Sequence, residues 1–326
     1  MRGGPMEPIN IVNVSGGVDS TACYLLALEE REKTGQDFRA VFADTGNEHQ
    51  ITIDYVNSLA EKTGGPKIQT VKADFTQRIA ARRIRLEMML ETRNFEEGWN
   101  EENVKRVLEH LCPTGIPFLD LCMWKGRFPG TKVRFCTGEL KLEAIKRGAT
   151  EPAICEMIAK GGQPSDVINW VGIRREESKA RANAQMWDTE NNGSRVYRPL
   201  VEWTKAACFD LLYKHGVDVN PLYKLGCGRV GCMPCIMARK AEIREMATRW
   251  PEHVDKLRKW ERIVKLCSMK EQATFFPANT IPGEGDTRAD IDSVVEWSKT
   301  GRGGMQYSME ALMEPPACSS LYGLCE

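Results

Sequence analysis

Six residues near the start of the chain carry the clearest chemistry. Ser15-Gly16-Gly17-Val18-Asp19-Ser20 lies between the apolar run at 9–14 and a segment with apolar residues at helical spacing. Two glycines let the backbone approach a ligand closely, so that amide N–H groups and the N-terminus of the next helix converge on one point. Ser15 and Ser20 add hydroxyl donors, and Asp19 is suited to cap the helix or reach a metal ion. The pattern predicts an oxyanion site; the alternative is a capped glycine turn without a ligand.

A second group of residues has the chemistry of a metal site. Cys227, Cys232 and Cys235 lie on one short loop that also carries three glycines. Three thiolates on such a loop can converge on a soft metal, and Cys136 is the candidate for the fourth ligand. Spacing alone leaves a [4Fe-4S] cluster and Zn²⁺ both open. The alternative is a set of free thiols.

Charged side chains follow two other apolar runs. Asp44 ends the second run, where a carboxylate can hold Mg²⁺ or a ribose hydroxyl, or simply cap a turn. Arg174 and Arg181 follow a later run, and guanidinium groups suit two-pronged capture of phosphate, sulfate or carboxylate. A further basic segment at 78–85 is interpreted as a solvated helix face in preference to a polynucleotide contact.

Six of the other cysteines form two groups outside the predicted metal site. Four lie in helical patterns and are expected to be small core residues: Cys23, Cys155, Cys208 and Cys267. Cys318 and Cys325 lie in the C-terminal tail. We expect them to form a mobile redox pair or to belong to a disordered segment.

These residues must be positioned by alternating strands and helices. Apolar runs at 9–14, 39–44, 67–73, about 167–173 and 195–203 predict strands, and helical patterns follow most of them. Such alternation predicts an α/β fold with parallel β-α-β units and ligands at the carboxyl ends of the strands. The predicted α/β domain that carries the Ser15 loop covers 1–238. Within it, 76–130 is an insertion over or along the site, helical in its first half and punctuated by proline and glycine from Pro113. A helical extension and loop-rich tail covers 239–326.

Composition excludes some classes of function. The 326 residues include 45 basic and 45 acidic side chains, so nucleic-acid contact would need a local patch. Twelve cysteines in a chain of this length favour metal binding, redox chemistry or burial over a disulfide framework. With no apolar run long enough to span a bilayer and no signal-peptide pattern, we expect a cytoplasmic protein without membrane contact.

Six motifs in order resemble the phosphoadenosine phosphosulfate reductase family, part of the PP-loop adenine-nucleotide superfamily. They are SGGVDS, the DTG at 44–46, RFCTGELK at 134–141, GIRREES at 172–178, RPLVEWTK at 198–205 and NPLYKLGCGRVGCMPC at 220–235. The resemblance covers roughly residues 9–238. Within the family, the sequence is similar to the compact, phage-type branch. It implies a five-stranded Rossmann-like sheet with helices on both faces, an adenine nucleotide over the SGGVDS loop, and arginines at the anionic end of the substrate. In members with cysteines at these four positions it also implies a [4Fe-4S] cluster.

The resemblance leaves the reaction open. ATP-cleaving relatives keep the SGGxDS form, as this chain does, whereas the sulfonucleotide reductases depart from it and end in a Glu-Cys-Gly motif. This chain ends in GLCE, with Cys325 as the candidate catalytic cysteine. The first hypothesis is cleavage of ATP between its α and β phosphates, with AMP placed on an acceptor and sulfur handled by the cluster. The second is reduction of adenylyl sulfate or phosphoadenylyl sulfate with a thioredoxin-like reductant. The third is a nucleotide-binding component of a nucleic-acid modification or defence complex; a homo-oligomer is also left open.

Overall fold

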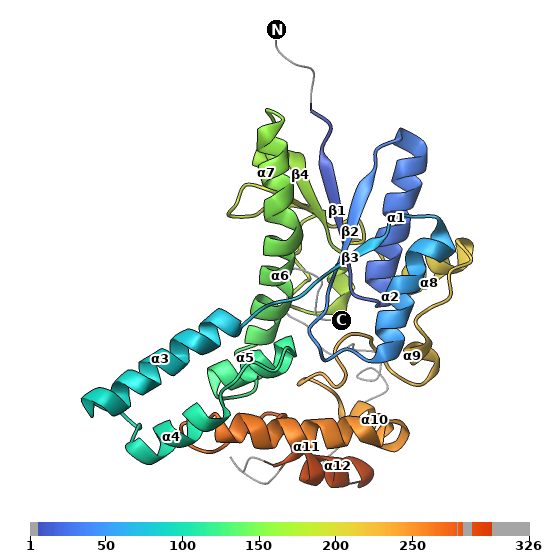
Figure 1. Cartoon of the computed structure of the whole chain (residues 1–326). Helices are drawn as coiled ribbons and strands as arrows, with labels where there is room; N and C mark the ends of the chain where they lie inside the picture. Colours follow the sequence, from blue (N-terminus) through green and yellow to red (C-terminus); the bar gives the residue numbers. More distant parts are fainter. Residues whose placement is uncertain (1–5, 279, 283–288, 302–326) are drawn as a thin grey trace.

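The computed structural model describes residues 6–278, 280–282 and 289–301. A twisted sheet with helices on both faces forms the upper part of Figure 1, and a group of helices forms the lower part. Among the described residues no helix is long and apolar enough to cross a membrane. The chain therefore has two structural parts, and the predicted site residues belong to the strand ends and loops between them.

The sheet has six strands in the order β3-β2-β1-β4-β6-β5. The strands are β1 (Ile9–Val14), β2 (Phe38–Ala43), β3 (Ile68–Val71), β4 (Val167–Trp170), β5 (Trp187–Thr189) and β6 (Arg195–Tyr197). All neighbours are parallel except β5 and β6, which pair antiparallel. The chain runs from β1 outward to β3 and then returns to β4 on the other side of β1. The β1/β4 boundary is therefore the switch point at which α/β sheets bind ligands.

Helices cover both faces of the sheet because its strands carry apolar residues on both faces. One face packs against α1 (Val18–Thr34), α2 (Gln50–Thr63) and α8 (Lys205–Lys214). The other packs against a nearly continuous helix at 137–159, here the crossover helix. It consists of π-helical turns η1 (Thr137–Leu142) and η2 (Lys146–Thr150), with α6 (Glu143–Ile145) between them and α7 (Glu151–Ala159) after them.

The lower part of Figure 1 is a helical lobe with its own core. It comprises α3 (Thr76–Thr92), α4 (Glu101–His110), α5 (Pro117–Lys125), α10 (Lys240–Arg249), α11 (Pro251–Leu266) and α12 (Ile291–Lys299). Phe118 of α5 stacks on Trp260 of α11 at 5.5 Å between ring centroids. The insertion after β3 and the segment after residue 238 thus bury their apolar faces against each other.

Three sequence expectations about elements are corrected. The sheet has six strands where five were expected, because β5 adds a short antiparallel edge strand. The stretch after Pro113 contains α5, which begins at Pro117, a residue well suited to the first helical position. The segment beyond Cys267, expected to be loop and tail, contains α12, whose Asp290 side chain accepts a hydrogen bond from the Ser293 amide and caps the helix.

Two side-chain expectations are corrected as well. Cys155 is exposed, whereas Cys23, Cys208 and Cys267 are buried as expected. The basic segment on α3 is not simply a solvated face. Arg82 donates to the carbonyl oxygens of Met123 (2.7 Å) and Cys267 (3.0 Å), which lie on two other parts of the lobe. Arg83 donates to the Leu111 carbonyl at 3.0 Å. These guanidinium groups connect the lobe's segments.

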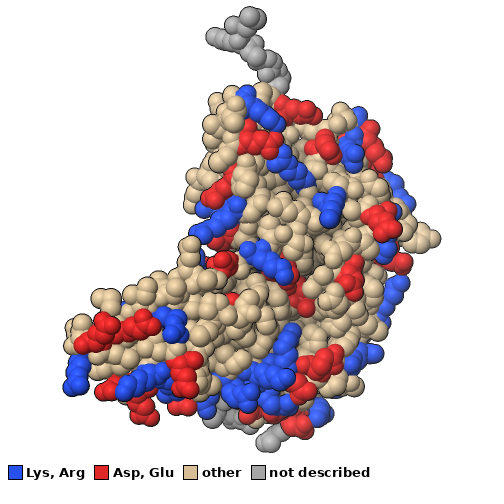
Figure 2. Space-filling view, in the orientation of Figure 1, with Lys and Arg blue, Asp and Glu red and all other residues tan. Residues whose placement is uncertain are grey.

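Charge is interspersed over the surface. Figure 2 shows acidic and basic side chains mixed over the upper part of this face, with basic side chains more concentrated over the helical lobe. This agrees with the balance of 45 basic and 45 acidic residues. A long-range cationic field therefore has no support from the charge distribution.

Candidate functional site

The Ser15 loop (residues 15–20) turns directly from β1 into α1. Gly16 has φ +85°, and a Cβ there would lie 2.8 Å from the Thr52 methyl group, so both backbone conformation and space require glycine. The hydroxyl of Ser20 accepts from the Ser15 amide at 3.0 Å and donates to the Gly17 carbonyl at 3.0 Å. Gly17 occupies the N-cap of α1 without a side-chain cap. The first turn of α1 therefore has no side-chain cap, and its amides other than that of Val18 can face an anion.

A short helix behind the loop holds it in place. α9 (Pro221–Lys224) follows Asn220, whose amide donates to the Gly16 carbonyl at 3.2 Å. Tyr223 accepts the Val18 amide hydrogen bond on its hydroxyl oxygen at 3.1 Å. Both residues lie in the NPLYK part of a motif noted in the sequence, but no role was assigned to them there. Residue type gave no signal, because their partners are about 205 positions away in the chain.

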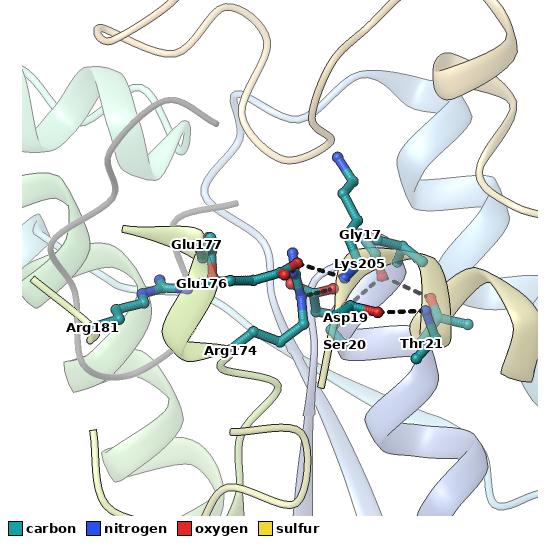
Figure 3. A network of polar contacts seen from close by, with 12 residues as sticks. Gly17, Asp19, Ser20, Thr21, Arg174, Glu176, Glu177, Arg181 and Lys205 are labelled. Carbon is teal, nitrogen blue, oxygen red and sulfur yellow. Dashed lines mark hydrogen bonds and ion pairs between the residues drawn. The ribbon is translucent and has the colours of Figure 1, made fainter. Parts of the chain in front are cut away.

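Arg174 reaches the Ser15 loop from the end of β4. Its guanidinium lies 2.8 Å from the Asp19 carboxylate, and both side chains are buried. Glu176 pairs with the same guanidinium and accepts from the Lys205 amide at 2.6 Å. Figure 3 shows Arg174 extending toward Asp19, with Glu176 and Lys205 beside it. Burial makes this charge network sensitive to the loss of either partner.

Gly172 lets the two segments approach each other. A Cβ on Gly172 would lie 2.7 Å from the Asp19 carbonyl oxygen and 3.0 Å from the Ser20 amide nitrogen. The backbone after β4 therefore packs directly on the first turn of α1. The spacing between Gly172 and Arg174 places the guanidinium against Asp19.

The structure separates Arg181 from Arg174. Arg181 is fully buried and pairs with Glu177, four residues before it in the chain. In Figure 3 the two arginines lie on opposite sides of the short turn η4 (Arg175–Glu177). Arg174 thus lies at the Ser15 loop, and Arg181 supports the segment that carries Arg174.

Asp44 lies at the end of β2, on the same sheet edge as the Ser15 loop. One carboxylate oxygen accepts from the Gly46 amide at 2.8 Å, and the other pairs with Lys72 at 2.6 Å. The carboxylate therefore acts as a turn cap and ion-pair partner here. To coordinate Mg²⁺ it would have to exchange Lys72 for the cation.

The cysteine loop (residues 226–235) places three predicted ligands around one small cavity. Cys227, Cys232 and Cys235 line it together with neighbouring residues that include Glu242 and Met246. Burial raises the pKa of the Cys227 thiol to about 11 and raises that of Cys232 further. Cys136 acts electrostatically on Cys232 but does not line the cavity. Within 6–278, 280–282 and 289–301, no three His, Cys, Asp or Glu side chains are close enough to hold a metal ion.

The cysteine loop is hydrogen-bonded to the turn after β2. The backbone N–H of Met233 donates to the Asn47 carbonyl at 2.7 Å, and the side-chain amide of Asn47 donates to the Pro234 carbonyl at 3.0 Å. The buried Glu48 carboxylate accepts from the Thr45 amide at 2.9 Å and from the Cys232 thiol at 3.5 Å. The DTG motif therefore supports the cysteine loop as well as the strand end.

The helical lobe also contacts this junction. Lys256 of α11 donates to the Asn47 side-chain oxygen at 3.1 Å, and burial lowers the pKa of its ammonium to about 8. His253 lies 3.2 Å from the Met233 carbonyl and stacks on His49 at 5.1 Å. Burial holds the pKa of His253 at about 4, so the ring is neutral at pH 7. The lobe thereby fixes the position of the cysteine loop relative to the sheet.

The structure brings the predicted site residues into two neighbouring groups. Arg174 lies beside the Ser15 loop, and Asp44 lies in the turn whose next residues hold the cysteine loop. Cys325 lies outside the described residues, as does Cys318.

Comparisons with known proteins identify the family of this chain. The sequence model of the phosphoadenosine phosphosulfate reductase domain matches residues 9–238. An uncharacterized 37.8 kDa protein of Escherichia phage 186 is 43% identical over 98% of this chain and 97% of its own length. The adenosine 5′-phosphosulfate reductase of Burkholderia cepacia is 36% identical over 36% of this chain and 46% of its own length. The crystal structure of a phosphoadenylyl-sulfate reductase from Candida auris, a phosphate complex, aligns at 17% identity over 69% of this chain and 82% of that chain, with a TM-score of 0.40.

Proposed function

Because the chain belongs to the phosphoadenosine phosphosulfate reductase family, we propose that it is an adenine-nucleotide enzyme that binds ATP on the Ser15 loop and cleaves it between the α and β phosphates. In this reaction an acceptor oxygen attacks the α phosphorus. The bond from that phosphorus to the bridging oxygen breaks, and pyrophosphate leaves. AMP on the acceptor then forms a leaving group for sulfur or nitrogen.

One observation carries the proposal. The Ser15 loop has the full SGGVDS pattern, and its Gly17 N-cap leaves the first turn of α1 without a side-chain cap. Backbone amides at such a turn stabilise phosphate oxygens, and the Ser15 hydroxyl would add a donor once it exchanges its bond to the Ser20 hydroxyl, at 3.0 Å, for phosphate. Arg174 supports the reaction in two ways: its bond to Asp19 orders the loop, and its charge stabilises the negative charge that develops on the phosphates. Mg²⁺ at Asp44 would neutralise the leaving pyrophosphate.

The four cysteines form the second half of the proposal. Cys227, Cys232 and Cys235 already line one cavity, and thiolates are the ligands that iron–sulfur clusters and zinc share. These residues fit a [4Fe-4S] cluster in kind, with Cys136 as the fourth ligand and Zn²⁺ as the alternative. A bound cluster would supply sulfur handling. In either case this chain's own residues bind the nucleotide and orient the acceptor.

A second function is favoured by the relatives named adenosine 5′-phosphosulfate reductase. Under that alternative the nucleotide is adenylyl sulfate or phosphoadenylyl sulfate. Cys325 attacks sulfur and displaces AMP or adenosine 3′,5′-bisphosphate. A thioredoxin-like dithiol then releases sulfite from Cys325 and is itself oxidised to a disulfide. Tight ATP binding with no turnover of any nucleotide would instead favour an accessory role in a nucleic-acid modification or defence complex.

Nucleotide binding by calorimetry tests the loop assignment. Gly17→Val places a side chain at the N-cap of α1, where we expect it to block the approach of phosphate to the amides. Arg174→Lys keeps the charge but loses the planar fork that meets both carboxylates, so it should weaken ATP binding by about tenfold or more. Arg85→Lys is the matched control, because Arg85 pairs with Glu96 on the exposed surface of α3. Equal ATP affinity in wild type and Gly17→Val would remove the loop from the site.

A further inference from the structure

The ends of α5 and α11 meet on the surface of the helical lobe. A Cβ on Gly126, the residue after α5, would lie 3.2 Å from the carbonyl oxygen of Cys267, the residue after α11, so the two segments are in contact. Arg82 of α3 joins them, because its guanidinium donates to carbonyl oxygens of both segments. The exposed side of residues 123–127 and 265–270 is here named the junction surface.

The junction surface carries cations that have no carboxylate partner. Arg127, Lys265 and Lys270 are exposed, and none of them pairs with a carboxylate among residues 6–278, 280–282 and 289–301. Neither of the two segments contains an acidic residue. Figure 2 shows basic side chains concentrated over this lobe. The charge of the junction surface is therefore positive and is not cancelled from within the two segments.

Two carboxylates next to these cations are already paired. Glu139 lies 3.9 Å from the Lys125 ammonium and also pairs with an arginine of α3. Glu271 follows the second segment directly, and its carboxylate lies 3.3 Å from the Arg106 guanidinium. Because each carboxylate already has a cationic partner, neither neutralises the exposed cations of the junction surface.

The chain after α5 continues the basic pattern toward the candidate metal site. Residues 121–138 contain no acidic residue and four basic ones: Lys125, Arg127, Lys132 and Arg134. Lys132 is exposed. The basic stretch therefore begins at the junction surface and ends beside Cys136.

Aromatic rings lie between the cations of this stretch. The Lys125 ammonium is 4.0 Å from the centroid of the Trp124 ring. The Arg127 guanidinium carbon is 5.6 Å from the centroid of the Phe135 ring. An aromatic ring has no net charge, so these contacts orient the cations without neutralising them. Both rings are only half-buried, so part of each is accessible to a ligand.

An extended polyanion matches this surface better than a small anion does. The exposed cations come from two segments of an open face, whereas a small ligand is held in a concave site by groups that converge on it. A nucleic acid repeats its negative charge at every nucleotide, and its unpaired bases can stack on aromatic side chains. An acidic peptide would supply charge but no bases for the rings.

We propose that the junction surface and the basic stretch up to Lys132 bind single-stranded nucleic acid through its phosphates. A chain with 45 basic and 45 acidic residues needs a local patch for such contact, and this surface is that patch. DNA and RNA share the phosphate chemistry on which the proposal depends. The proposal goes beyond ATP cleavage and does not depend on it.

Fluorescence anisotropy with a labelled oligothymidylate of about 12 nucleotides tests the proposal, and an oligouridylate of the same length tests RNA. Wild-type protein should bind with a Kd of about 10 µM at about 0.05 M salt. The logarithm of the association constant should fall linearly with the logarithm of salt concentration. The expected slope is about −0.7 for each phosphate contact, or about −3 for four contacts.

Removal of two junction cations should change both the affinity and the slope. Arg127→Gln combined with Lys265→Gln should weaken binding by about tenfold and make the slope shallower by about 1.4. Arg127→Lys combined with Lys265→Arg keeps both charges and should keep the wild-type slope, which a purely structural role would not predict. Lys132→Gln is an independent variant at an exposed position, and it should make the slope shallower by about 0.7.

Lys62→Gln combined with Lys67→Gln is the matched control. Both lysines are exposed and have no carboxylate partner in the described part of the chain, and they precede β3 at the opposite edge of the sheet. Lys62 also lies over an aromatic ring, 6.0 Å from the Tyr55 centroid. The control removes the same charge from the molecule and should match wild type in affinity and slope. Circular dichroism should show all variants folded.

Four results would overturn the proposal. They are no binding of either oligonucleotide by wild type, equal slopes in the junction and control variants, tighter binding of a duplex of the same sequence, and displacement of the oligonucleotide by polyglutamate at equal charge concentration. The last result would identify an acidic protein as the partner. If the oligonucleotide binds as described while ATP stays intact, the junction surface stands and the proposed ATP chemistry fails.

Discussion

Gly172→Ala is expected to disturb the Ser15 loop through a single methyl group. The new Cβ would lie 2.7 Å from the Asp19 carbonyl oxygen, where ordinary contact begins at 3.4 Å, so the two backbone segments must separate by about 0.7 Å. The obstacle is backbone in the first turn of α1, which cannot rotate away as a side chain can. Overpacking of this kind costs about 1–3 kcal/mol. Unfolding should therefore begin a few degrees lower, and ATP binding should weaken by about tenfold to a hundredfold.

Calorimetric titration with ATP, with a thermal scan of the same sample, measures both effects. Gly130→Ala is the control, because its Cβ would have no other residue within 4 Å and its φ is not positive. We expect Gly130→Ala to match wild type in both measurements. If Gly172→Ala also binds ATP with wild-type affinity, then the contact between the β4 end and the α1 turn does not shape a phosphate site, and the reasoning is refuted.

Three further changes probe the lobe, the junction and the cysteines. Arg82→Met should lower the free energy of unfolding by about 3 kcal/mol, because three partly buried carbonyl groups lose their donor. Exposed Arg85→Met should change it by less than about 0.5 kcal/mol, and equal denaturation midpoints for the two variants would contradict this. The pKa of His253 is about 4 in the folded protein and 6.5 as a free group, so the unfolded chain binds the extra proton and the free energy of unfolding falls as pH drops from 6.5 toward 4. His253→Gln should therefore flatten that part of a profile of melting temperature against pH. An unchanged slope would show that another group titrates. Cys136→Ser should lower the iron or zinc content of anaerobically purified protein, and a full metal complement in this variant would remove Cys136 from the ligand set.

Periodic and motif-bearing parts of the chain were predictable from sequence. The apolar run at 9–14 and the helical pattern after it gave β1 and α1, because buried elements of ordinary length leave a clear period. β5 was missed because all three of its residues are exposed, so it has no apolar run. α12 was missed because it follows a proline- and glycine-containing stretch and is only 9 residues long.

The position of the Ser15 loop in the fold was predictable from sequence, but the contacts that hold it were not. The SGGVDS pattern identified the loop, because its glycines allow a backbone conformation that is set by the local sequence. By contrast, the bonds from Asn220 and Tyr223 to that loop join residues about 205 positions apart, and no local pattern encodes them.

Nucleotide product analysis tests the central claim most directly. The protein, purified anaerobically, is incubated with ATP and Mg²⁺, with water as the acceptor, and separately with phosphoadenylyl sulfate and a thioredoxin-like dithiol, and the products are identified by mass spectrometry. We predict AMP and pyrophosphate from ATP, at a rate that Gly17→Val reduces, with no sulfite from phosphoadenylyl sulfate. Sulfite and adenosine 3′,5′-bisphosphate in the second incubation, with intact ATP in the first, would contradict the account and establish the reductase.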